Sequence, residues 1–168
     1  MVKKFKTLFF VKSSLISLYL ALTIPIPFIS SGGLKIISIM AFVLGLFLIV
    51  NITSDYVEIS NNKISYKTTL ISNLIGYKSW EVFWKDIKSI DSSPTSQGSK
   101  VYYFITFKDQ KFLVPQRVQN LEELFSLIVE RTGIKKEGLN YISPMWTYKL
   151  LTFISLFMII GEIISFSA

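Results

Sequence analysis

Three long apolar runs and one stretch of alternating apolar and polar residues divide the chain. The apolar runs lie at residues 8–29, 34–52 and 150–166. Each is close to the roughly 20 residues that an α-helix needs to cross a hydrocarbon core of about 30 Å. Residues 54–141 instead show short alternating runs that are typical of β-strands. We therefore expect a membrane protein of α+β class, with a small folded domain between membrane helices.

The first two runs predict a transmembrane hairpin within residues 1–53, preceded by a short basic segment. Only four residues, Ser-Ser-Gly-Gly at 30–33, connect the two runs. Pro25 and Pro27 fall near the end of the first run, where a bend disturbs a helix least. Ala41 and Gly45 are small residues four apart, a spacing that lets membrane helices approach closely, although ordinary composition explains it equally well. The alternative for the first run is a cleaved signal peptide, which also begins with lysines.

The third run predicts a C-terminal transmembrane helix within residues 142–168. Trp146, Tyr148 and Lys149 precede it, as aromatic and basic residues do at a membrane interface. A buried core helix and an amphipathic surface helix are the alternatives, but apolar residues occupy all sides of this helix. Glu162 is its one charged residue.

The alternating stretch predicts a meander of short strands. Residues 56–59 and 63–68 alternate on either side of an Asn-Asn turn, and Trp80, Val82 and Trp84 alternate in a later run. Residues 87–90, 101–107 and 111–114 predict further strands, while 69–77 is ambiguous. The Ser, Pro and Gly content of residues 92–99 predicts a loop.

One amphipathic helix, at about residues 121–132, closes this domain. Asn120 is the expected N-cap, and Glu122 and Glu123 fall in the first turn, where the helix dipole favours acids. Gly133 occupies the position where a glycine commonly ends a helix. The helix has a single apolar stripe, which we expect to pack against a sheet or the open end of a barrel. Its members are Leu121, Leu124, Phe125, Ile128 and Val129.

Composition removes several classes of chemistry. Apolar residues make up 51% of the 168 residues, which is typical of a membrane protein. The absence of cysteine and histidine excludes disulfides, thiol nucleophiles, imidazole bases and the usual zinc sites. Asp55 with Glu58 and Glu122 with Glu123 are the only closely spaced acids, and we interpret them as a solvated strand edge and as helix capping. We therefore expect no enzyme activity, and no catalytic, cofactor or metal site.

The net charge of +7 is unevenly distributed. Residues 1–53 hold five lysines and no acid, whereas residues 54–144 hold twelve basic and ten acidic residues. This asymmetry indicates membrane topology and not nucleic-acid binding. It predicts a multi-pass protein of a bacterial inner membrane or a thylakoid, with the domain on the cytoplasmic or stromal side and the C-terminus opposite. Lys3, Lys4 and Lys6 are also expected to attract anionic lipid.

The order of these elements resembles a bacterial pleckstrin-homology-like (PH-like) domain over residues 55–133. The resemblance rests on an opening strand and turn, a W-x-D-I-x-x-I step and a helix start; the residues are Val57, Ile59, Asn62, Lys63, Ile64, Trp84, Asp86, Ile87, Ile90, Asn120, Leu121 and Leu124. It implies a small β-barrel or sandwich with a C-terminal capping helix, at residues 54–141. The layout is also similar to that of the photosystem I assembly factors of cyanobacteria and chloroplasts, from which the third apolar run and the short N-terminus depart.

The resemblance gives the two tryptophans of residues 79–91 different roles. Trp84 is expected to be a core anchor between the sheets and the helix. Trp80 lies nearer the apolar stretch 70–75 and is expected to face the bilayer or a partner, so Trp80, Leu74 and Ile75 are candidate partner contacts.

Two functions agree with this architecture. The first is a scaffold, assembly or regulatory factor that binds a membrane protein or a second copy of itself. The second is a module that binds anionic lipid headgroups, with Lys63, Lys67 and Lys78 as candidate contacts; the alternative is that these lysines are merely solvated strand positions.

The membrane helices offer one more candidate pair. An isolated carboxylate within a span is costly and commonly has a partner. Lys35 lies near the far surface that Glu162 approaches, so we expect the two to meet unless Glu162 is protonated or reaches the surface alone.

Overall fold

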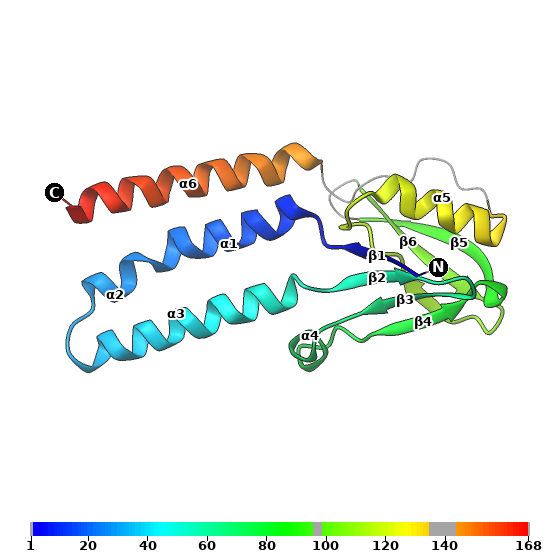
Figure 1. Ribbon diagram of the computed structural model, residues 1–168, viewed down its shortest axis with the longest axis horizontal. Helices are drawn as coiled ribbons and strands as arrows, with labels where there is room; N and C mark the ends of the chain where they lie inside the picture. Colours follow the sequence, from blue (N-terminus) through cyan, green and yellow to red (C-terminus); the bar gives the residue numbers. More distant parts are fainter. Residues whose placement is uncertain (1, 96–98, 135–143, 168) are drawn as a thin grey trace. The chain divides into compact units, whose positions relative to one another are not determined.

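The computed structural model describes residues 2–95, 99–134 and 144–167, and the chain forms two compact units (Figure 1). The first, here called the β-unit, comprises Met1–Leu8 and Ser54–Ser143. The second, here called the helical unit, comprises Phe9–Thr53 and Pro144–Ala168. The fold is α+β, with two antiparallel sheets in the β-unit. The predicted end of the domain at residue 141 lies outside the described residues.

The first sheet has four strands in the order β1-β2-β3-β4. They are β1 (Lys3–Lys6), β2 (Tyr56–Ile59), β3 (Lys63–Lys67) and β4 (Trp80–Phe83). The predicted hairpin between β2 and β3 is confirmed, with Ile59 opposite Ile64 across the Asn61-Asn62 turn. Between β3 and β4 the ambiguous stretch forms a short helix, α4 (Leu70–Leu74).

The first strand corrects the expectation for the N-terminus. Residues 3–6 do not form a free basic segment ahead of the hairpin, because β1 pairs with β2 in the sheet. Lys3 pairs with Glu123, and Lys4 lies 3.7 Å from Glu58, so neither lysine is a freely solvated charge. The hairpin of apolar helices is therefore an insertion between two paired strands of the β-unit.

The second sheet has three strands, β5 (Ile87–Pro94), β6 (Lys100–Thr106) and β7 (Lys111–Leu113). A short 3-10 turn, η1 (Trp84–Asp86), connects β4 to β5. The loop predicted at residues 92–99 is wrong at its start, because residues 92–94 continue β5 opposite residues 100–102. Residues 96–98 lie outside the described part of the chain.

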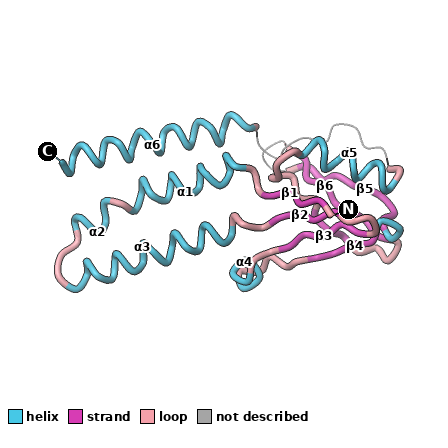
Figure 2. The backbone as a smooth tube through the Cα atoms, in the orientation of Figure 1, coloured by secondary structure: helices cyan, strands magenta, loops and turns pink. Residues whose placement is uncertain are grey.

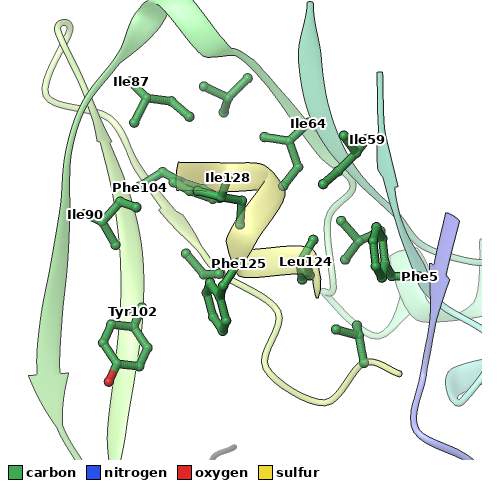
Figure 3. Close-up of a cluster of buried hydrophobic side chains, with 14 of the residues drawn as sticks. Phe5, Ile59, Ile64, Ile87, Ile90, Tyr102, Phe104, Leu124, Phe125 and Ile128 are labelled. Atoms are coloured by element: carbon green, nitrogen blue, oxygen red, sulfur yellow. The ribbon is translucent and has the colours of Figure 1, made fainter. Parts of the chain in front are cut away.

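The core of the β-unit lies between the two sheets and α5 (Leu121–Thr132). Figure 3 shows Leu124, Phe125 and Ile128 of α5 among side chains that include Ile64 of the first sheet and Phe104 of the second. Full burial of one such aliphatic side chain contributes about 1.5–3 kcal/mol. The predicted apolar stripe is confirmed, since Leu121, Leu124, Phe125 and Ile128 are buried.

The two ends of α5 compare differently with the prediction. Gly133 ends the helix in the left-handed region at φ 70°, as expected. Asn120 occupies the N-cap position, as expected, and its carbonyl accepts from the Leu124 N–H at 3.0 Å, but its backbone is left-handed at φ 52° and its side chain makes no capping hydrogen bond. The two glutamates remain in the first turn, where Glu123 meets Lys3.

Trp84 is the core anchor that its alternation with Val82 predicts. Its side chain is 7% exposed, and its Nε1 donates a hydrogen bond to the Ser60 carbonyl at 3.0 Å. Trp80, Val82 and Trp84 all face inward, while Glu81 and Phe83 are exposed.

The helical unit contains α1 (Phe9–Thr23), α2 (Pro25–Ile29), α3 (Gly33–Ile52) and α6 (Met145–Ser167). Figure 2 shows these helices as elongated rods. Three segments, Phe9–Ile29, Gly33–Ile52 and Met145–Ser167, are long and apolar enough to span a membrane. The prolines that divide α1 from α2 fall where the sequence predicts a bend, because Pro25 has no N–H for the helical hydrogen bond.

Small residues bring these helices together. The buried positions of α1 are Val11, Ser14, Ser17 and Ala21, and α6, which lies along α1, buries Ser155. Gly45 of α3 accommodates Tyr19, whose hydroxyl donates to the Phe42 carbonyl at 2.8 Å. A Cβ at Gly45 would lie 2.8 Å from Tyr19 Cζ, which is closer than real side chains approach.

The expected ion pair between Lys35 and Glu162 is absent, although both residues are described. Lys35 is exposed near the start of α3. Glu162 is half-buried on α6, with one carboxylate oxygen buried and without a hydrogen-bond partner. The reason lies in the packing, because α6 lies along α1, and Figure 1 shows α1 between α6 and α3.

Candidate binding groove

A groove of about 330 Å³ opens on the β-unit, and we call it the β-unit groove. Its walls are formed by the residues just after β1 and just before β2, by the first residue of β4 and by the segment that follows β7. Its lining residues are Thr7, Asp55, Tyr66, Tyr77, Trp80, Leu113, Val114, Pro115, Gln116, Arg117 and Val118.

Backbone hydrogen bonds hold the segment after β7 against the end of β1. The Leu8 N–H donates to the Arg117 carbonyl at 2.9 Å, and the Gln119 N–H donates to the Lys6 carbonyl at 2.8 Å. Val114 and Val118 are buried and fix this segment to the core, which leaves Arg117 exposed between them. One wall of the groove is therefore attached to the last residues before α1.

Aromatic side chains form the second wall. The Trp80 ring lies 6.1 Å from Tyr66, 5.5 Å from Phe112 and 6.0 Å from Phe104, measured between centroids. Trp80 is half-buried, so it contacts the core and also lines the groove. Trp80, which the sequence predicts to face the bilayer or a partner, thus packs partly against the core and partly lines the groove, and its contact with a partner stays a prediction.

Asp55 accepts three hydrogen bonds, each 3.0 Å long, of which two come from α4 and its N-cap and one from β3. Its Oδ1 accepts from the Thr69 backbone N–H and from the Ser72 hydroxyl, and its Oδ2 accepts from the Tyr66 hydroxyl. Asp55 is 7% exposed, which corrects its interpretation as a solvated strand edge. Glu58, its expected neighbour, lies instead on β2 beside Lys4.

This arrangement changes the acidity of the Tyr66 phenol. Burial raises the pKa of Tyr66 well above its ordinary value, and the negative charge of Asp55 and the hydrogen bond to it raise the pKa further. The phenol therefore stays protonated at physiological pH and donates to Asp55.

The predicted lipid-binding lysines lie outside the groove. Lys63 Nζ lies 2.8 Å from a Glu81 carboxylate oxygen and Lys67 Nζ lies 4.0 Å from the same oxygen, so the structure brings these two lysines together around an acid. The hydrogen bond and the charge of Lys63 lower the pKa of the Glu81 carboxyl. Lys78 is exposed and belongs to the segment that leads into β4. Lys63 and Lys67 therefore share one acidic neighbour, and lipid binding by the three lysines stays a prediction.

Two other hollows on the β-unit are less suited to a ligand. One of about 140 Å³ has charged residues such as Glu81, Asp86 and Lys108 around it. The other, of about 380 Å³, is bounded by the Asn61-Asn62 turn, Phe83 of β4 and the start of η1. The β-unit groove is larger than the first hollow and is lined by more elements than the second.

Sequence reasoning found Trp80 but missed Arg117, Tyr77 and Leu113. The position of Arg117 beside the groove depends on the pairing of residues 6–8 with 117–119, which no local pattern indicates. Leu74 and Ile75, the other predicted partner contacts, are 87% and 54% exposed and lie outside the groove, on and just after α4.

Comparisons with known proteins identify a relative without a described role. No family model matches the chain. The chain is similar to the uncharacterized protein slr0269 of Synechocystis sp., with 29% identity over 147 residues. The match covers 84% of this chain and 74% of that protein.

Proposed function

We propose that this protein is a multi-pass membrane protein whose β-unit is a PH-like, non-enzymatic binding module. Its role is to hold a membrane-protein partner, as a scaffold, assembly or regulatory factor does. Support for the PH-like assignment comes from two antiparallel sheets followed in the chain by α5, because the resemblance implies strands first and one helix last.

One observation carries the proposal: the groove is built from residues that adjoin two membrane helices in the chain. Thr7 lies two residues before α1, and Asp55 lies three residues after the end of α3 at Ile52. A ligand in the groove therefore binds at residues that are covalently close to two spans. The membrane-proximal segment of another membrane protein fits that situation.

The chemistry of the groove favours a polypeptide over a lipid headgroup. Tyr77, Trp80 and Leu113 offer apolar and aromatic contacts, while Arg117 offers one cation at the rim. Asp55 places a carboxylate in the same groove, which opposes a phosphate headgroup. Aromatic residues and arginine are also the types that dominate protein interfaces.

The proposed topology places the β-unit on the cytoplasmic or stromal side. The pairing of β1 with β2 requires the two ends of the α1–α3 hairpin to meet on one side of the membrane. The lysines before and within the start of α1 favour the cytoplasmic or stromal side. If α6 spans, the C-terminus lies opposite.

Co-purification in mild detergent tests the function. We expect a stoichiometric membrane protein to accompany the wild type and the Phe107→Ser control, whose side chain is exposed outside the groove, and to be lost with Leu113→Ser. Co-purified anionic lipid without protein, lost on Arg117→Gln, would support headgroup binding instead. Equal recovery of partner by both serine variants would overturn the groove as the binding site.

A further inference from the structure

In the short helix α4, the burial of Ser72 and the exposure of both leucines are reversed relative to a helix of a soluble domain, while Ile71 is half-buried and Asn73 is exposed. Ser72, a polar residue, is completely buried, whereas Leu70 and Leu74 are 84% and 87% exposed. Ile75, which follows the helix, is 54% exposed. A surface helix in water buries its apolar face and exposes its polar face. This reversal indicates that the medium around α4 is apolar.

Hydrogen bonds fix α4 in this reversed orientation. Thr69 caps the helix by accepting from the Ser72 N–H at 3.2 Å, and the Ser72 hydroxyl donates to Asp55 at 3.0 Å. Asp55 also accepts from the Thr69 N–H at 3.0 Å. Rotating the leucines inward would break these bonds, so their exposure is a fixed feature of the fold.

The short chain distance between α4 and the predicted span α3 indicates that this apolar medium is the membrane. Asp55 follows the last residue of α3 by three residues, and consecutive Cα atoms lie 3.8 Å apart, so at most about 11 Å of chain separates them. The N-terminus of α4 is bonded to Asp55 and is therefore tethered to the end of a predicted span. Lys67 and Lys78 flank α4 in the chain, and the exposed Lys78 can reach the phosphate groups of lipids.

We propose that Leu70, Leu74 and Ile75, here called the α4 apolar face, insert into the interfacial region of the bilayer that α3 crosses. The ligand is the lipid surface itself. The insertion restrains the β-unit at the membrane and orients the groove toward membrane-proximal segments. It stands independently of partner binding, because the inserted residues Leu70, Leu74 and Ile75 do not line the groove.

Site-directed labelling of the full chain in lipid nanodiscs tests this inference. The chain has no cysteine, so Leu74→Cys gives a single site for a spin label or an environment-sensitive fluorophore. Phe107→Cys, in an exposed turn of the β-unit, is the aqueous control, and Phe47→Cys, within α3, is the membrane control.

We expect the Leu74 label to be accessible to oxygen and shielded from a water-soluble nickel reagent, at a depth between the two controls. Labels at Leu74 and Phe107 with equal nickel accessibility would overturn the proposal. Shielding that occurs in native membranes but not in nanodiscs of pure lipid would also overturn it, because a protein would then be the occupant.

Discussion

Replacing Asp55 is expected to release α4 from the β-unit. The Asp55 carboxylate accepts three hydrogen bonds of 3.0 Å, from Tyr66, Thr69 and Ser72, and is almost completely buried. One hydrogen bond to a charged group contributes about 1.5–3 kcal/mol, and neighbouring bonds do not add fully. We estimate a loss of about 3 kcal/mol for Asp55→Ala, and about 1 kcal/mol for Asp55→Asn, which keeps an acceptor oxygen.

Trypsin digestion of the full chain in nanodiscs measures this loss locally, because Lys67 and Lys78 bracket α4. A loss of about 3 kcal/mol raises the open population roughly 100-fold, and cleavage at these two lysines should accelerate accordingly. Asp91→Ala is the control, since Asp91 is exposed and accepts a hydrogen bond from the nearby Ser89 hydroxyl at the surface. Equal cleavage rates in the two alanine variants would refute the role assigned to Asp55.

Three further predictions concern other parts of the chain. Trp84→Ala should destabilise the β-unit by about 3–5 kcal/mol, measured by urea unfolding, and Trp84→Phe by less. Gly45→Ala should lower the thermal stability of the hairpin in detergent, and adding Tyr19→Ala should remove that effect, because the new Cβ meets the Tyr19 ring. The raised pKa of Tyr66 stabilises the fold below pH 10, its unfolded value, and this stabilisation is lost as pH rises toward the folded value. Unfolding measured from pH 9 to 11.5 should therefore show a weaker pH dependence in Tyr66→Phe; equal slopes would contradict the assignment.

Local patterns predicted the elements whose residues carry a periodic signal. The β2–β3 hairpin, the end of α5 at Gly133 and the three apolar helices all follow from alternation, turn residues or run length. Trp84 was predicted to be buried because it alternates with Val82, and it is.

Features that depend on distant pairing could not be found in this way. Residues 3–6 were predicted to be a basic segment, because three lysines among four residues do not indicate a strand. Only the pairing with β2 shows that they form one. Arg117 lies at the groove because backbone hydrogen bonds hold its segment against residues 6–8, more than 100 positions away in the chain. A fragment of residues 54–141 alone would lack β1 and the core residue Phe5, so experiments on the β-unit require the full chain.

The pair of Lys35 and Glu162 failed for a related reason. Axial position predicted that the two charges lie at similar depth, but it does not specify which helices are neighbours. The structure packs α6 along α1, with the small residues Ser14, Ser17 and Ala21 buried on α1.

Photo-crosslinking in native membranes tests the central claim, that the β-unit groove binds a membrane protein. A photoreactive amino acid replaces Leu113, which is 47% exposed in the groove, or Phe107, which is 68% exposed outside it. We predict a discrete crosslinked membrane protein from position 113 that is absent from position 107. Identical protein products from both positions, or crosslinks from position 113 to lipid alone, would contradict the account.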